Sequence, residues 1–224
     1  MPNESEQTVT AIEEHPKRRG RFVISIGDEP IATVPAETIA ELHIRLGATL
    51  DPRNLDALRV HDRRTVLLDR ALRLLAVRAR ATSELTRRLL RAKDRPRADD
   101  MQWVVRTLTE RGYLDDARFA DQFVRDHAAG RGWGKHRLQT ELRRRGVSQA
   151  NMEPALSQAD DDAALDDMRS AAAVAQKWRR THSARDPERD RQRLYGFLAR
   201  RGFAPDVIRA AMHAVLVEGD VEST

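Results

Sequence analysis

The sequences HRLQTELRRRGV at residues 136–147 and QRLYGFLARRGF at residues 192–203 follow one pattern. Each has Arg-Leu, a second leucine four positions on, a basic cluster, a glycine and then an apolar residue. SELTRRLLRAKD at residues 83–94 is a weaker third copy, with Lys93 where the other copies have glycine. Leucines four residues apart lie on one face of a helix, and a pattern that recurs along a chain indicates a repeat architecture. The sequence therefore predicts tandem helical repeats.

A second pattern predicts where further helices begin. An apolar residue stands directly before a helix-capping position, and another apolar residue follows five positions after the first. This spacing is typical of the hydrophobic staple, in which the two apolar side chains pack across the first turn of a helix. The three instances are Leu114-Asp115-Phe119, Val147-Ser148-Met152 and Phe203-Ala204-Ile208.

The residues before the repeats have a different character. Phe22–Ile26 and Ile31–Val34 are rich in β-branched residues and flank the turn signal Gly27-Asp28-Glu29-Pro30, which predicts a β-hairpin. A helical segment follows from Pro35 to about Gly47. A second, short helix is expected to start at Asp51-Pro52, with aspartate as the cap and proline at the first helical position.

We therefore predict a mainly α fold of tandem three-helix repeats in an elongated curved array, with a small N-terminal β-hairpin and helix appendage. Each repeat is too small to bury much surface alone, so stacked neighbours should supply the core. The predicted parts are a disordered tail at 1–20, an α+β appendage at 21–64, repeats at 65–114, 115–159 and 160–218, and a tail at 219–224.

Composition excludes several classes of protein. None of the 224 residues is cysteine, which rules out disulfides, a thiol nucleophile and cysteine-ligated metals. No apolar run approaches the length of a membrane span, and the acidic, polar first residues are unlike a secretory signal. We expect a cytoplasmic protein with no membrane contact.

Charge is distributed unevenly, although the formal net charge is only +5. Residues 78–97 hold eight Arg or Lys against two acids, residues 125–147 seven against two, and residues 177–201 nine against three. These blocks coincide with the second helix of each predicted repeat and predict a basic stripe that contacts a polyanion. The alternative is that they are the solvated faces of charged helices. The candidate contact residues are Arg87, Arg88, Arg91, Lys135, Arg137, Arg143, Arg144, Arg145, Arg200 and Arg201.

The glycine-rich loop at residues 130–135 precedes a predicted helix. Its backbone amides could meet an anion at the helix N-terminus, or the loop could be a flexible connector. It is not a phosphate-binding Walker loop, because the glycine spacing differs and His136 stands where Ser or Thr would bind magnesium. Trp133 could stack on a base or pack as a lid over neighbouring helices.

The sequence shows no catalytic constellation. The acidic run Asp160–Asp162 is interpreted as favourable charge at the start of a long helix rather than a metal site. The histidines are scattered without metal-ligand or triad spacing. We expect no enzyme activity, no cofactor and no metal.

Three blocks together carry a family resemblance. ERGYLDDARFADQFVRDH at 110–127, RGWGKHRLQTELRRRGV at 131–147 and FLARRGFAPDVI at 197–208 resemble the bacterial regulatory protein RecX family in order and spacing, and the resemblance covers residues 65–216. It implies tandem three-helix repeats and a non-enzymatic, monomeric modulator of the RecA recombinase. Members bind RecA and the RecA–DNA filament, lie in its groove, and restrain ATP hydrolysis, strand exchange and co-protease activity in recombination, repair and the SOS response.

Two other functions remain open at the level of sequence. The basic stripe alone fits a nucleic-acid-binding module that contacts single- or double-stranded DNA directly, without RecA. The mixed charge also fits a helical-repeat adaptor for another protein.

Overall fold

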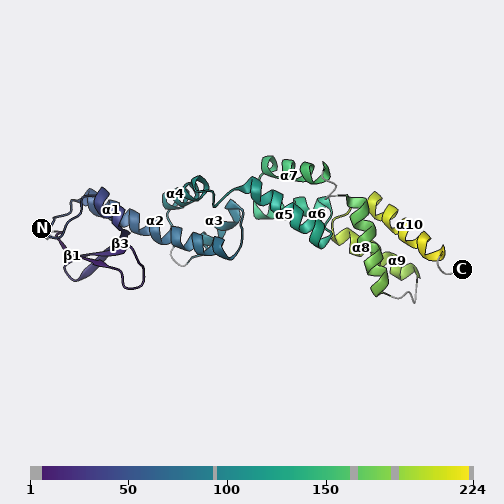
Figure 1. Cartoon of the computed structure of the whole chain (residues 1–224), viewed down its shortest axis with the longest axis horizontal. Coiled ribbons are helices and arrows are strands. Elements are labelled where there is room, and N and C mark those ends of the chain that lie inside the picture. Colours follow the sequence, from purple (N-terminus) through teal and green to yellow (C-terminus); the bar gives the residue numbers. More distant parts are fainter. Residues whose placement is uncertain (1–6, 93–94, 162–165, 183–186, 222–224) are drawn as a thin grey trace. The chain divides into compact units, whose positions relative to one another are not determined.

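The structure is a computed structural model that describes residues 7–92, 95–161, 166–182 and 187–221 (Figure 1). The chain forms two compact units. The N-terminal unit contains residues 1–78 and 85–113, and the C-terminal unit contains residues 79–84 and 114–224. Across the described ranges, no helix is both long and apolar enough to cross a membrane.

A three-stranded antiparallel sheet begins the N-terminal unit. The predicted hairpin is confirmed, with Phe22 opposite Val34 and Ile24 opposite Ala32. The prediction of a disordered tail at residues 1–20 is wrong for residues 9–14, which form an edge strand. That strand is stabilised by pairing with the hairpin and by burial of Val9. Its sequence VTAIEE is half apolar, but it stands among polar residues that suggested a tail. The strands are β1 (Val9–Glu14), β2 (Arg21–Ile26) and β3 (Glu29–Pro35), in the order β1-β2-β3.

Two helices follow the sheet, α1 (Ala36–Glu41) and α2 (Pro52–Val77). Asp51 caps α2 as predicted, because its carboxylate accepts a hydrogen bond of 2.7 Å from the amide of Asn54. The prediction of a short helix here is wrong, since α2 has 26 residues and runs without a break through the predicted boundary at residues 64 and 65. Its first half buries Leu55 and Leu58 in the core with the sheet, and α4 (Ala98–Glu110) packs beside it.

A buried carboxylate joins α2 to α4. Asp100, in the first turn of α4, is only 3% exposed. Its two oxygens accept hydrogen bonds of 3.0 Å from Arg63 and 3.1 Å from Arg64. A buried charge needs such partners to offset the loss of its hydration.

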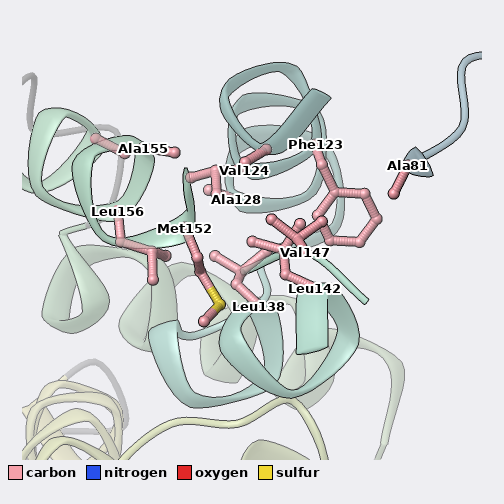
Figure 2. Packing of buried hydrophobic residues seen from close by; sticks show 12 residues of the cluster. Ala81, Phe123, Val124, Ala128, Leu138, Leu142, Val147, Met152, Ala155 and Leu156 are labelled. Carbon is pink, nitrogen blue, oxygen red and sulfur yellow. The ribbon is translucent and has the colours of Figure 1, made fainter. Parts of the chain in front are cut away.

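Helix α3 (Thr82–Leu90) begins in the C-terminal unit, and its remaining residues belong to the N-terminal unit. In the C-terminal unit, three helices share one apolar core (Figure 2). Val124 and Ala128 face Leu138, Leu142 and the residues of the third helix. Ala81 reaches this core from the segment before α3. The helices are α5 (Asp116–Arg131), α6 (Lys135–Arg145) and α7 (Gln149–Asp161).

A second core of the same unit lies among α8 (Asp167–Thr181), α9 (Pro187–Arg200) and α10 (Pro205–Val221). Leu194 and Leu198 are buried there, as the repeat pattern predicts. The mainly helical fold with a small N-terminal sheet and helix is therefore confirmed. The elongated, curved arrangement and the division into three repeats stay predictions, although the boundaries predicted at 64 and 65 and at 159 and 160 fall inside α2 and α7.

The ends of the helices test the predicted glycine stops, caps and acidic helix start. Gly146 and Gly202 end α6 and α9 in the left-handed region, both at φ 83°, and the predicted caps Asp115 and Ser148 accept hydrogen bonds from the amides of Arg118 and Asn151. The interpretation of Asp160–Asp162 as a helix start is wrong for Asp160 and Asp161. These two residues end α7, so the predicted boundary at 159 and 160 falls inside that helix, and Asp162 lies outside the described residues.

Candidate anion-binding groove

Two glycine turns bring α6 and α9 into close contact. The amide of Gly134 donates a 2.9 Å hydrogen bond to the carbonyl of Arg201. A Cβ atom at Gly134 would lie 2.6 Å from the carbonyl oxygen of Gly202, and one at Gly202 would lie 2.4 Å from Cβ of Arg137. The loop at residues 130–135 is thus a packed connection rather than a flexible connector. Since the Gly134 amide is already bonded, it does not serve an anion.

The C-terminal unit contains two contacts of one kind, which we call turn joints. In each, a residue at a helix start packs against a glycine that ends another helix, Gly202 in one joint and Gly146 in the other. In one copy, the carboxylate of Asp167 accepts a hydrogen bond from the amide of Lys135 at 3.3 Å. In the other, Asp116 accepts one from the amide of Thr82 at 2.7 Å, and Ser83 donates its hydroxyl hydrogen to the carbonyl of Gly146. Each joint therefore combines a carboxylate at a helix start with a glycine that ends another helix.

A hollow of about 1400 Å³ lies beside the second joint, between the α5–α6 loop, α8 and α9. Its described lining contains six cations and no carboxylate. Like charges gathered without counter-ions attract anions. We call this hollow the basic groove and define it by Arg131, Arg137, Lys177, Arg193, Arg200 and Arg201.

Two of these arginines are fixed by the protein itself. The Arg137 guanidinium lies 4.1 Å from the centre of the Trp133 ring and donates a 2.8 Å hydrogen bond to the carbonyl of Arg200. The Arg201 guanidinium lies over Phe197 and donates to the carbonyl of Arg131. Burial, and then the positive charge of Arg137, lower the pKa of Arg201. An anion bound in the groove would relieve this repulsion.

The other four cations are exposed. Among the residues that the structure describes, no carboxylate pairs with Arg131, Lys177 or Arg200. Arg193 lies 3.6 Å from Asp190 on its own helix and stays 70% exposed. The exposed cations can therefore reach a ligand that enters the groove.

The two tryptophan rings near the groove already pack against other side chains. Trp133 packs between Arg137 and the His127 ring, whose centre is 4.5 Å from its own, and it contacts the core of α5–α7. Trp178 is 8% exposed and stacks on His182 at 4.3 Å. Trp133 is thus a lid on its neighbouring helices, as one of the two sequence interpretations held. Burial also lowers the pKa of His127, against the raising effect of its hydrogen bond to the Phe123 carbonyl.

The structure brings three of the ten predicted contact residues, Arg137, Arg200 and Arg201, into the groove. The side chains of Arg143, Arg144 and Arg145 belong to the last turn of α6, where the latter two pair with Glu141 and Arg145 also lies over Phe123. Lys135 begins α6 at the turn joint. The exposed residues Arg87, Arg88 and Arg91 belong to the N-terminal unit.

Sequence reasoning missed Arg131, Lys177 and Arg193 as individual candidates. All three lie within the basic blocks, so the charge count contained a signal for them. The charge count could not distinguish these three residues from the other basic residues of the blocks, because the groove is formed by side chains from several helices.

Comparison with known proteins identifies the family. The family model for the second three-helix domain of RecX matches residues 115–156, and the model for the third such domain matches residues 166–212. The regulatory protein RecX of Mycolicibacterium smegmatis is 42% identical over 136 residues, which cover 59% of this chain and 70% of that protein. The chain belongs to the RecX family.

Other RecX proteins match over different lengths. RecX of Halorhodospira halophila is 39% identical over 148 residues, covering 65% of this chain and 86% of that protein. RecX of Bacillus subtilis is 28% identical over 215 residues, covering 96% and 80%. These relatives are named as regulatory proteins.

Solved RecX structures share the fold. One crystal structure of regulatory protein RecX has a TM-score of 0.73 at 20% identity and covers 92% of this chain and 99% of its own. The structure of RecX from Lactobacillus salivarius has a TM-score of 0.56 at 20% identity, with 70% and 98% covered.

Proposed function

We propose that this RecX-family chain binds the RecA recombinase and the RecA–DNA filament, and that it restrains the ATPase, strand-exchange and co-protease activities of RecA. It acts without chemistry of its own and needs no cofactor. The observation that supports binding to a filament is the basic groove, whose described lining gathers six cations and no carboxylate. A nucleoprotein filament is a polyanion, and cations such as Arg131, Lys177 and Arg200, which pair with no carboxylate among the described residues, favour such a partner.

The predicted contact residues outside the groove belong to the same proposal. Arg143 and Arg144 are exposed, at 78% for the Arg144 side chain, and extend the positive surface of α6. Arg145 has a different role, because it is half-buried between Glu141 and the Phe123 ring. We therefore assign filament contact to Arg143 and Arg144 and a packing role to Arg145.

The test is the ATPase rate of RecA on single-stranded DNA, with the chain added before or after filament assembly. We expect the rate to fall in proportion to the chain added. Reversing the charge of Arg143 and Arg144 should weaken this inhibition while far-ultraviolet circular dichroism stays unchanged. Inhibition equal to that of the unchanged chain would remove these two residues from the mechanism, and no inhibition by the unchanged chain would refute the proposal.

The basic groove also supports a second candidate function, DNA binding without RecA. That function predicts strong DNA affinity in the absence of RecA, no gain when RecA is added, and a steep loss of affinity with salt. Measuring DNA affinity with and without RecA separates the two candidates.

A further inference from the structure

We infer that the basic groove is a sequence-independent site for the sugar-phosphate backbone of single-stranded DNA. This inference deepens the proposed function, on which it rests for its biological role, because it names the component of the filament that the groove contacts. It depends on three features of the C-terminal unit: the cations of the groove, the packed tryptophan rings and the position of the cations inside the hollow.

The cations select phosphate as the anion. A single strand carries a phosphate at every nucleotide, so it offers an anion wherever Arg131, Lys177 or Arg200 is placed. A peptide matches the groove only if an acidic side chain falls at each cation. Arginine also bonds phosphate oxygens through two parallel N–H groups, which suits the guanidinium groups in the lining.

The aromatic rings of the lining determine whether the bases of the strand can be bound as well as its backbone. Proteins that grip single strands by base stacking need exposed aromatic faces. Here Trp133 is covered by Arg137 and His127, and Trp178 is covered by His182. Of the rings in the described lining, the two indoles and Phe197 are already in contact with other side chains, and the exposed His182 has one face stacked on Trp178. We therefore expect contacts to the backbone to dominate recognition. A backbone contact carries no sequence information.

The position of the cations favours a single strand over a duplex. Arg137 and Arg201 are only partly exposed and lie inside the hollow rather than on a flat face. A duplex is a stiff, wide rod, and its phosphates cannot enter such a hollow without bending it. A single strand is flexible and can follow a positively charged groove.

The test measures how tightly the full chain binds a fluorescent dT oligonucleotide of about 15 nucleotides, by anisotropy in a salt series without RecA. The groove variant is Lys177→Gln with Arg200→Gln, two exposed residues. The control variant is Arg73→Gln with Arg209→Gln, which removes the same charge from exposed positions outside the groove. Circular dichroism verifies that both variants fold.

Loss of two phosphate contacts should lower the slope of log affinity against log salt by about 1.4 and weaken binding about tenfold at 0.15 M salt. The control should change affinity much less. An oligonucleotide of mixed sequence should bind as well as dT, whereas a duplex and poly-glutamate should bind more weakly.

Equal losses in the groove and control variants would overturn the inference, as would tighter binding of poly-glutamate or duplex. Inhibition of the RecA ATPase, measured on the same samples, keeps the two proposals separate. If the unchanged chain inhibits RecA but the groove variant binds dT normally, the inference fails and the proposed function stands. If the unchanged chain binds dT through the groove but does not inhibit RecA, the proposed function fails and the binding site stands.

Discussion

Replacing Gly134 by alanine should destabilise the C-terminal unit, although alanine is compatible with the local backbone. Gly134 has φ −74° and ψ 163°, which any residue can adopt. Its added Cβ would lie 2.6 Å from the oxygen and 2.8 Å from the carbon of the Gly202 carbonyl, and 2.9 Å from the Phe203 ring. Backbone atoms cannot turn away as a flexible side chain can, so the two turns must separate. Forced shifts of this kind cost about 1–3 kcal/mol.

A neighbouring glycine gives the matched control. Gly130 lies in α5, and a Cβ atom there would meet nothing within 4 Å. Gly130→Ala should stabilise the chain by about 0.5–1 kcal/mol, because glycine inside a helix loses more backbone entropy than alanine. Two identical replacements four residues apart, one in α5 and one at the start of α6, are thus expected to change stability in opposite directions.

A third variant separates the clash from helix capping. Gly134 is the N-cap of α6, where glycine is better than alanine and serine is better than glycine. If capping alone explained the loss, Gly134→Ser would be at least as stable as the unchanged chain. Because serine also carries a Cβ, we expect it to be destabilising. Urea unfolding followed by circular dichroism measures all three variants, and a stable Gly134→Ser chain would refute the close-approach argument.

Three further results are expected from changes at single residues. Asp100→Ala should lower the free energy of unfolding by about 2–3 kcal/mol, because it leaves Arg63 and Arg64 without their buried carboxylate. The matched change at the exposed Asp99, Asp99→Ala, should alter it by less than about 0.5 kcal/mol, and urea unfolding measures both. Asp116→Ala should cost about 1 kcal/mol by removing the cap on the Thr82 amide, and faster hydrogen exchange at that amide is the measurement. The lowered pKa of His127 means that the unfolded chain takes up a proton more readily than the folded chain, so the free energy of unfolding should fall as the pH drops below about 6.5. His127→Phe should make this fall smaller in urea unfolding curves recorded at several pH values. An unchanged fall would exclude His127 as its source.

The sequence predicted those features that depend on short segments. The matched glycines, the apolar residues after them and the leucines four apart all lie within single helices and their ends, and Gly146, Gly202, Leu194 and Leu198 occupy the expected positions. The cap of α2 joins Asp51 to Asn54, only three positions away, and could therefore also be predicted from the sequence. Local patterns suffice wherever the interaction itself is local.

Features that depend on distant partners were not predictable. The β1 residues, read together with the polar residues around them, look like a polar tail until they pair with β2, from Glu14 opposite Phe22 to Val9 opposite Ile26. The role of Gly134 depends on Gly202, and the environment of Lys177 depends on residues of α6 and α9. Positive charge could be counted in the sequence, but the arginines that share one hollow could not be separated from those that pair with Glu141.

The two turn joints have a consequence for how such a chain can grow. Each uses the carboxylate of Asp116 or Asp167 at one end of a helical segment, and Gly146 or Gly202 at another. In the segment from Asp116 to Asp161, Asp116 and Gly146 contact the residues that precede it, and Gly134 and Lys135 contact the residues that follow it. A second copy of this segment would present the same attachment points to its neighbours, so the contacts between segments would not have to change when the molecule is lengthened.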